Sequence, residues 1–229
     1  MIEDPPLLTL KKLLKRPEAS QLEALTGASN GMLVDCLGGR GALCQTVKPV
    51  NPLAASFTGV ALTCDAGPAD NLAVFGALHL AQPGDVIVIA TDAFMATAVI
   101  GDLVVGMAKN KGVGAMVTDG CIRDIEGTIA TGLPCYASGV TPNSPARNGP
   151  GSAGLPVTVG GVPVNSGDVV AGDADGVVVV PIDLLDDVIA KLEDVKRAEA
   201  ELDARVAAGL TMTEFASAVI ESDRVKWVD

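Results

Sequence analysis

The chain has 229 residues, of which 48% are hydrophobic, so it can bury one large core or two small ones. Its formal net charge of −12 repels phosphate backbones and anionic lipid surfaces, so we expect neither a nucleic acid nor a membrane as a partner. No basic segment near the N-terminus leads into an apolar run with a cleavage site, and no apolar run of about eighteen residues occurs. We therefore expect a cytoplasmic protein.

The first 38 residues carry helical patterns that Pro17 interrupts. Ser29 precedes a segment whose apolar residues, Leu33 and Leu37 among them, recur on one side. A serine in that place is a favourable N-cap, because its hydroxyl accepts a hydrogen bond from the first turn. We expect residues 1–38 to form a helical segment ahead of the core.

Residues 54–181 consist of short apolar runs rich in Val, Ile and Ala, separated by Gly, Pro and Asp. Such runs predict buried strands. The expected strands are 59–63, 85–90, 115–118, 157–159, 168–170 and 177–180. Between the second and the third, the Ala-rich stretch 95–110 is long enough for a crossover helix. This region therefore predicts a layered α/β core.

Two similar turns, 82–85 and 165–168, each lead into a Val-rich run, and we interpret them as equivalent strand entrances. The stretch 141–154 is rich in Pro, Gly and Asn and predicts a loop. A loop of this length forms the rim of an active site or a subunit contact, or it is only a mobile surface connection.

After Pro181 the pattern becomes helical, with Asp183 as the expected cap and Gly209 as the expected end. One apolar stripe runs along this segment and consists of Leu184, Val188, Leu192 and Val195. Residues 183–229 therefore predict a C-terminal helical extension.

The five cysteines include no Cys-x-x-Cys pair and are odd in number, which argues against a disulfide framework or a zinc site. We expect them to act as small buried hydrophobes. Cys121 is expected to line a strand end rather than to act as a nucleophile, because no histidine stands near it. The single histidine, His79, is expected in the core or on a helix surface, so no Ser-His-Asp triad is indicated.

Arg123 and Asp124 stand side by side, with Asp102 upstream. A planar guanidinium beside a hard oxygen ligand suits an anionic oxo acid held next to a divalent metal. By itself, however, an Arg-Asp dipeptide is most often a surface ion pair. The surrounding sequence decides between these two interpretations.

Fragments that frame this pair extend from residue 29 to residue 181. They are 29–35 (SNGMLVD), 67–71 (GPADN), 82–85 (QPGD), 100–103 (IGDL), 112–120 (GVGAMVTDG), 132–134 (GLP), 156–161 (PVTVGG), 166–168 (SGD) and 172–181 (GDADGVVVVP). In this order, the sequence resembles the family of the regulator of ribonuclease activity A (RraA) and its metal-dependent pyruvate aldolases. Single fragments are weak signals, whereas their ordered combination is specific.

The resemblance implies a single domain at 1–229, with a layered β/β/α swivelling-type core at 54–181 and helices at 183–229. It implies a carbon-carbon lyase that cleaves 4-hydroxy-4-methyl-2-oxoglutarate or 4-carboxy-4-hydroxy-2-oxoadipate. Pyruvate would be released through a metal-bound enolate, with a side activity as an oxaloacetate decarboxylase. The implied cofactor is Mg²⁺ or Mn²⁺, and the implied assembly is a homotrimer or homohexamer.

The resemblance also assigns roles to residues. Asp124 would bind the metal, and Arg123 would stabilise the developing enolate oxygen and the leaving hydroxyl. Backbone N–H groups at Gly101, Asp102 and Leu103, where a helix opens, would bind the substrate carboxylate. Asp102 would orient the water that takes the 4-hydroxyl proton.

A neighbouring subunit would complete the metal shell, with Glu199 as the matching acidic residue and Asp35 as the weaker candidate. The alternative electron sink, a Schiff-base lysine, is not supported, because Lys109 and Lys111 lie in a polar turn. The chain departs from the aldolase pattern at 99–100, where Val-Ile replaces a frequent Trp-containing segment.

Two function classes remain open at this stage. The first is the aldolase, and the second is a non-catalytic regulator that binds an RNA-degrading enzyme. In the family, an acidic residue at the position of Asp102 accompanies aldolase activity, which favours the first. A methyltransferase, a third label used in the family, would need a methyl-donor site, and no Gly-x-Gly-x-x-Gly loop is present.

Overall fold

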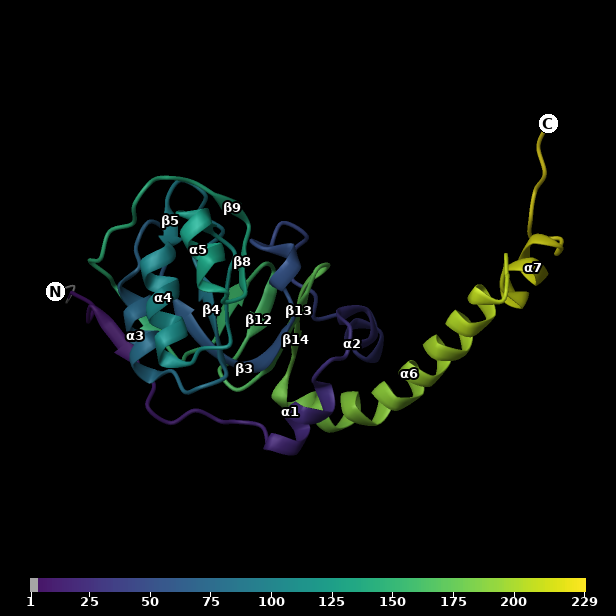
Figure 1. The fold of residues 1–229 in the computed structure, drawn as a ribbon, viewed down its shortest axis with the longest axis horizontal. Coiled ribbons are helices and arrows are strands. Elements are labelled where there is room, and N and C mark those ends of the chain that lie inside the picture. Colours follow the sequence, from purple (N-terminus) through teal and green to yellow (C-terminus); the bar gives the residue numbers. More distant parts are fainter. Residues whose placement is uncertain (1–3) are drawn as a thin grey trace.

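The computed structural model describes residues 4–229 as an α/β body from which one long helix extends (Figure 1). The main sheet has nine strands and is mixed. Its centre is parallel and consists of β3 (Phe57–Asp65), β4 (Asp85–Ala90), β6 (Ala115–Thr118) and β8 (Cys135–Ala137). Around this centre lie β1 (Leu8–Leu10), β10 (Gly151–Ala153), β2 (Lys48–Pro49), β13 (Val169–Asp173) and β14 (Gly176–Val180).

Two smaller sheets complete the strands. β5 (Ala98–Ile100), β7 (Cys121–Ile122) and β9 (Gly139–Val140) form a parallel three-stranded sheet, and β11 (Val157–Val159) pairs with β12 (Val162–Val164). The α-helices are α1 (Ala19–Leu25), α2 (Asn30–Cys36), α3 (Leu72–Leu80), α4 (Asp102–Lys111), α5 (Ile125–Thr131), α6 (Leu185–Ala207) and α7 (Glu214–Ile220). Short 3₁₀ turns are η1 (Pro52–Ala54) and η2 (Ile182–Leu184).

The parallel strands are buried on both faces, which explains their continuous apolar sequence. Successive residues alternate between two cores, because side chains along a strand point to opposite faces. Ile87 and Ile89 of β4 pack in the core that contains α3 and α4, whereas Val86 and Val88 face the core that contains β11. A third core joins β13 and β14 to α1, α2 and the first half of α6.

All six expected strands are confirmed. The two expected turns, before β4 and β13, are held by the same kind of hydrogen bond. The backbone N–H of Gln82 donates to the Asp85 carboxylate at 2.9 Å, and the backbone N–H of Asn165 donates to Asp168 at 2.7 Å. Both aspartates are 1% exposed. A buried carboxylate therefore ties each turn at the point where its strand begins.

Several local expectations were wrong. Residues 1–38 were expected to be helical; 1–3 lie outside the described residues, and 4–38 also hold β1, which pairs with β10. The stretch 95–110 was expected to be one helix, but β5 precedes α4 within it. The stretch 141–154, expected to be a loop, ends in β10.

The C-terminal segment is helical as expected, and α6 ends at Ala207, two residues before Gly209. Asp183 does not cap this helix; it lies in η2 and pairs with Lys15 at 2.5 Å. Instead, the Asp168 carboxylate accepts the backbone N–H of Ile182 at 2.9 Å.

The Ser29 cap and four of the five cysteines are as expected, whereas Cys44, expected to be buried, is not. The Ser29 hydroxyl accepts the backbone N–H of Met32, as an N-cap does. Four cysteines are buried and Cys44 is exposed, and no disulfide forms among them. His79 is exposed on α3. No helix within residues 4–229 is both long and apolar enough to cross a membrane.

Candidate active site

The site lies at the carboxyl edge of the small parallel sheet. β5 and β7 are parallel neighbours, and α4 and α5 begin directly after them. The backbone N–H of Arg123 donates to the carbonyl of Ile100 at 3.1 Å, which fixes the two strand ends beside each other. Since parallel strands end at the same edge, Gly101 and Asp102 meet Arg123 and Asp124 there.

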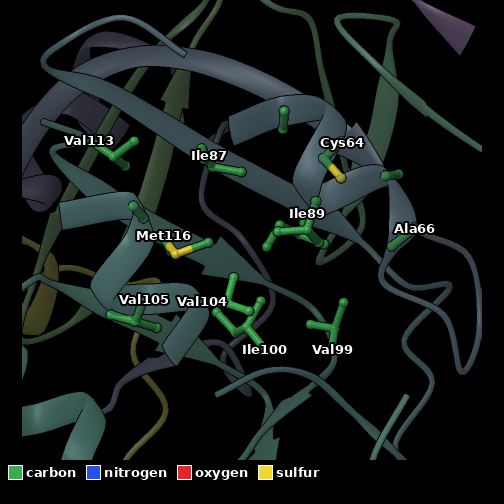
Figure 2. Close-up of a cluster of buried hydrophobic side chains, with 14 of the residues drawn as sticks. Cys64, Ala66, Ile87, Ile89, Val99, Ile100, Val104, Val105, Val113 and Met116 are labelled. Carbon is green, nitrogen blue, oxygen red and sulfur yellow. The ribbon is translucent and has the colours of Figure 1, made fainter. Parts of the chain in front are cut away.

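This edge rests on the largest buried core. Val99, Ile100, Val104 and Val105 point into the cluster around β4 and β6 and are at most 8% exposed (Figure 2). Gly101 and Asp102 are therefore flanked on both sides by core residues. The apolar packing holds the start of α4 in place without using its polar groups.

Arg123 reaches in two directions from the end of β7. Its Nε lies 3.1 Å from Asp124 Oδ2, and its Nη1 donates to the Ser144 hydroxyl. The side chains of Arg123 and Asp124 are 34% and 46% exposed. An ion pair that water reaches this easily contributes at most about 1 kcal/mol to stability.

Asp124 adopts the left-handed conformation, with φ 54° and ψ 52°. It stands at the N-cap of α5, yet its side chain makes no capping hydrogen bond. The carboxylate instead lies against Gly101, where an added Cβ would be 2.7 Å from Asp124 Oδ2 and 3.0 Å from Arg123 Cγ. Only glycine at 101 leaves room for this arrangement.

Asp102 lies against the neighbouring helix in a reciprocal way. A Cβ at Gly127 of α5 would meet Asp102 Oδ2 at 2.5 Å and Asp102 Cβ at 2.7 Å. Asp102 Oδ1 accepts the backbone N–H of Leu103 at 2.7 Å. Two glycines thus allow two acidic side chains to lie between the starts of α4 and α5.

A shallow pocket of about 80 Å³ opens at this place. Its polar lining consists of Asn71, Gly101, Asp102, Arg123, Asp124, Ser144 and Arg147. Asn71 is 3% exposed and its amide donates to the carbonyl of Val99 at 3.2 Å, whereas its Oδ1 has no partner within the described residues. A buried acceptor of this kind suits a donor such as a hydroxyl or a water molecule.

Three of these lining residues were missed by sequence reasoning: Asn71, Ser144 and Arg147. Asn71 belongs to the fragment 67–71, which was a signal of the family but not of a role. Ser144 and Arg147 belong to the expected loop 141–154, which lines one side of this pocket.

The donor set fits a hard divalent cation. Asp124 offers a partly exposed carboxylate at the pocket, and Asp102 offers a second one. Within residues 4–229 no group of three or more His, Cys, Asp or Glu side chains gathers. Mg²⁺ commonly takes only one or two carboxylates and keeps several waters.

Alternative nucleophiles lie away from this pocket or are inert. Lys109 and Lys111 belong to the last turn of α4, at the helix end opposite Asp102. Burial raises the pKa of the Cys121 thiol, which is 2% exposed and donates to the carbonyl of Met95. Cys121 thus lines the strand end as a neutral thiol, as expected.

Asp35 and Glu199 do not join the pocket within one chain. Asp35 is exposed on α2, and Glu199 is exposed on the outer half of α6. Figure 1 shows that both helices lie on the side of the body away from α4 and α5. Their expected role from a neighbouring subunit stays a prediction.

A larger cavity of about 560 Å³ lies between α2, β14 and the start of α6. Its walls are mainly apolar, with Arg40, Asp187 and Lys191 at the edge. The Arg123–Asp124 pair and Asp102 are absent from it. The smaller pocket is the better candidate, because the groups able to do chemistry converge there.

Several known proteins are similar to this chain in sequence and in fold. A family model described as RraA-like, Aldolase/RraA, matches residues 28–179. A protein of Halalkalibacterium halodurans named "Putative 4-hydroxy-4-methyl-2-oxoglutarate aldolase" is 40% identical over 171 residues, which cover 75% of this chain and 80% of that protein.

Two similar solved structures are described as a member of a ribonuclease inhibitor family and as an inhibitor of RNA processing. Streptomyces coelicolor RraAS2, titled an unusual member of the RNase ES inhibitor RraA protein family, has a TM-score of 0.74 and 29% identity, over 83% of this chain and all of that one (100%). The RNA-processing inhibitor RraA from Thermus thermophilis has a TM-score of 0.62 and 28% identity, over 68% of this chain and 94% of that one. The matched model, the relatives and the fold agree, and the chain belongs to the RraA-like family.

Proposed function

We propose that this protein is a divalent-metal-dependent aldolase that cleaves 4-hydroxy-2-oxo acids of the 4-hydroxy-4-methyl-2-oxoglutarate type and releases pyruvate. The observation that carries the proposal is the convergence of Arg123, Asp124 and Asp102 on Gly101 at one strand edge. The name of the 40% identical relative supports it. Oxaloacetate decarboxylation is the proposed side activity, because loss of carbon dioxide from oxaloacetate leaves the same pyruvate enolate.

The proposed cleavage breaks the bond between C3 and C4. Its electron pair moves to C3 and onto the 2-oxo oxygen, which gives an enolate, while the 4-hydroxyl loses its proton and becomes a carbonyl. Arg123 presents fixed N–H donors where this negative charge grows, and the loss of such a donor typically costs about 10²–10³ in rate. The enolate is then protonated at C3 to give pyruvate.

The start of α4 and Asp102 have separate tasks in this proposal. The helix N-terminus binds the carboxylate of the pyruvate half through the backbone N–H groups of Gly101 and Asp102 and through the helix dipole, while the Leu103 N–H holds the Asp102 carboxylate. Asp102 holds the water that accepts the 4-hydroxyl proton. Its carboxylate is already oriented by the Leu103 N–H, at 2.7 Å.

Mg²⁺ or Mn²⁺ is the proposed cofactor, with Asp124 as its direct ligand. Bound there, a divalent cation supplies Lewis acidity at the 2-oxo oxygen. Asp124 is suited to hold it because its left-handed backbone turns the carboxylate out of the capping position and toward the pocket.

A homotrimer or homohexamer is the proposed assembly, with a cleft shared between subunits. Exposed apolar side chains support it: Leu103 and Met107 of α4 are 72% and 49% exposed beside the pocket, and Phe215 of α7 is 80% exposed. Glu199, or alternatively Asp35, would reach the pocket of a neighbour and complete the shell around the cation. A repeated rotation would close such contacts into a ring.

The second candidate is a regulator that binds an RNA-degrading enzyme without chemistry of its own. The titles of the two RraA structures favour it. The arrangement of Asp102 beside Gly127 favours the enzyme, since a docking surface has no need for a recessed carboxylate.

One assay separates the two candidates. Pyruvate release is measured from 4-hydroxy-4-methyl-2-oxoglutarate and from oxaloacetate, with Mg²⁺, with Mn²⁺ and after chelation, and borohydride is added with pyruvate in a parallel sample. We expect turnover that needs the metal and survives borohydride. Full turnover after exhaustive chelation, or a trapped lysine adduct, contradicts the metal mechanism. No turnover on either acid favours the regulator.

A further inference from the structure

Arg147 is a second cation at the pocket that the proposed chemistry leaves unused. Of the residues that line the pocket, only Arg123 and Arg147 are positively charged. Arg123 is engaged by Asp124 and Ser144. Arg147 forms no ion pair within residues 4–229, and its Cζ lies 5.7 Å from the centre of the Phe75 ring.

The loop that carries Arg147 is fixed on both sides of it. The backbone N–H of Ala146 donates to Ala69 at 2.7 Å, and the carbonyl of Ala146 accepts from Asn71 at 3.0 Å. On the other side, the Asp70 carboxylate accepts the backbone N–H of Asn148 at 2.6 Å. Asp70 is 9% exposed, so water competes little for these bonds.

Arg147 is therefore exposed but positioned. The backbone bonds fix its Cα, and its Cζ lies over the Phe75 ring, a cation–π arrangement. Its N–H donors have no side-chain hydrogen-bond partner or ion pair in the described part of the chain, so they can bind a planar anion such as a carboxylate. An arginine held in advance loses less freedom on binding than a mobile one.

The net charge of the chain explains why a second arginine is useful at this pocket. The chain has a net charge of −12, so a doubly charged acid is repelled at long range, and each of its carboxylates needs a local cation or helix terminus. In the proposed function, the start of α4 receives the carboxylate of the pyruvate half. A carboxylate at the far end of the same substrate has only Arg147 to receive it.

We infer that Arg147 binds the distal carboxylate of the substrate and makes the protein select dicarboxylic 4-hydroxy-2-oxo acids over monocarboxylic ones. This inference rests on the proposed function for the reaction, but it concerns a different residue and a different end of the substrate. Arg147 contributes to substrate binding and takes no part in breaking the bond.

The test compares two acids that share the pyruvate half. At C4, 4-hydroxy-4-methyl-2-oxoglutarate carries a methyl group and the distal carboxylate, whereas 4-hydroxy-2-oxopentanoate keeps the methyl group and carries hydrogen in place of that carboxylate. For Arg147→Gln, we expect kcat/KM to fall at least about tenfold on the dicarboxylate, chiefly through a raised KM, and at most about twofold on the monocarboxylate. Arg147→Lys should restore part of the loss, because it keeps the charge but not the fork.

Arg40→Gln is the matched control. Arg40 is another exposed arginine, but it lies at the separate cavity near α2, so its loss removes the same charge from elsewhere on the surface. We expect this variant to leave the preference for the dicarboxylate unchanged. An Arg147→Gln variant that loses activity equally on both acids, or on neither, overturns the inference while the aldolase proposal stands.

A binding measurement covers the case in which the unaltered protein cleaves neither acid. Calorimetry with 2-oxoglutarate and 2-oxobutanoate, in the presence of Mg²⁺, reports the preference without turnover. Preferential binding of 2-oxoglutarate that Arg147→Gln abolishes supports the role of Arg147, although the aldolase proposal then fails. Equal binding of 2-oxoglutarate by both proteins overturns the role of Arg147.

Discussion

The chain contains two Arg–Asp pairs that differ in almost every physical respect. Arg16 holds Asp85 with two hydrogen bonds, of 2.6 and 2.9 Å, across 69 positions of sequence, and the Asp85 side chain is 1% exposed. Arg123 and Asp124 are adjacent in sequence, share a single contact of 3.1 Å and are both partly exposed. The first pair joins the N-terminal segment to the entrance of β4.

We call Arg16–Asp85 the structural pair, because the fold uses its polar atoms, and Arg123–Asp124 the available pair, because it can still bind a ligand. Asp85 also accepts the backbone N–H of Gln82, so its oxygens are used within the fold. The hydrogen bond between Arg16 and Asp85 raises the pKa of Arg16. The Asp124 side chain caps no helix, and the residue sits in a left-handed conformation that Asp and Asn adopt more readily than most residues. A pair whose carboxylate contributes little to the fold is free to bind something else.

The largest effect on activity is expected from variants that remove one member of the available pair. Arg123→Ala and Asp124→Ala should each lower kcat/KM by at least about 10², because both act on charge that forms in the transition state. For Arg123→Ala the free energy of unfolding should fall by no more than about 1 kcal/mol, since the pair is exposed. Asp124→Ala should cost about 1–2 kcal/mol more, because alanine is disfavoured in the left-handed conformation of residue 124. Steady-state kinetics and urea unfolding of the same preparations check this.

The matched variant Asp102→Ala should spare pyruvate binding more than it spares turnover, because Asp102 acts through water on the 4-hydroxyl proton. Near-normal rates for Arg123→Ala on every oxo acid tested would mean that the pocket is assigned wrongly.

A mixture of two inactive proteins should restore activity, if the pair at the pocket needs a carboxylate from a neighbour. In a ring, roughly a quarter of the clefts would combine the intact Arg123 of one chain with the intact Glu199 of the next when Arg123→Ala and Glu199→Ala chains are mixed equally. Pyruvate release after subunit exchange checks this. Absent recovery despite proven exchange removes Glu199 from the site, and a fully active monomer in light scattering refutes the shared cleft.

The structural pair gives the opposite expectation. Arg16→Ala should lower the free energy of unfolding by about 3 kcal/mol, because it leaves the Asp85 carboxylate buried without its cation. The folded protein at low temperature should keep its rate, since Arg16 is remote from the pocket. Urea unfolding followed by circular dichroism measures the first, and kinetics measure the second. Loss of rate without loss of stability would reverse the distinction between the pairs.

The smallest expected effect comes from Gly127→Ala. Alanine is preferred to glycine within a helix by about 1 kcal/mol, but its Cβ would lie 2.5 Å from Asp102 Oδ2 and displace that carboxylate. We expect kcat to fall by about tenfold, with unfolding changed by about 1 kcal/mol or less because the two effects oppose each other. Gly106→Ala on α4 is the control, since an added Cβ there meets nothing within 4 Å.

How far the sequence predicts this molecule depends on where each contact comes from. The Val- and Ile-rich strands β4 and β6 follow from composition, because burial on both faces requires continuous apolar residues. β5 was missed because its three residues follow an Ala-rich stretch that favours helix, and only pairing with β7 and burial make it a strand.

The site divides in the same way. Asp102, Arg123 and Asp124 were marked by the fragments that resemble the family, although β5 and β7, the strands directly before them, were not expected. Arg147 reaches the pocket only because the Asp70 carboxylate fixes a loop 78 and 79 positions away, a long-range contact that no local pattern reveals.

The most direct test of the account is the binding of Mn²⁺, followed by its electron paramagnetic resonance signal, to the unaltered protein, to Asp124→Asn and to Asp85→Asn. We predict that the unaltered protein binds Mn²⁺, that Asp124→Asn loses this binding while it remains folded, and that folded Asp85→Asn retains it. Asparagine tolerates the left-handed conformation, so the backbone at 124 is preserved. Unchanged Mn²⁺ binding by Asp124→Asn would contradict the central claim that this exposed pair exists to hold a metal.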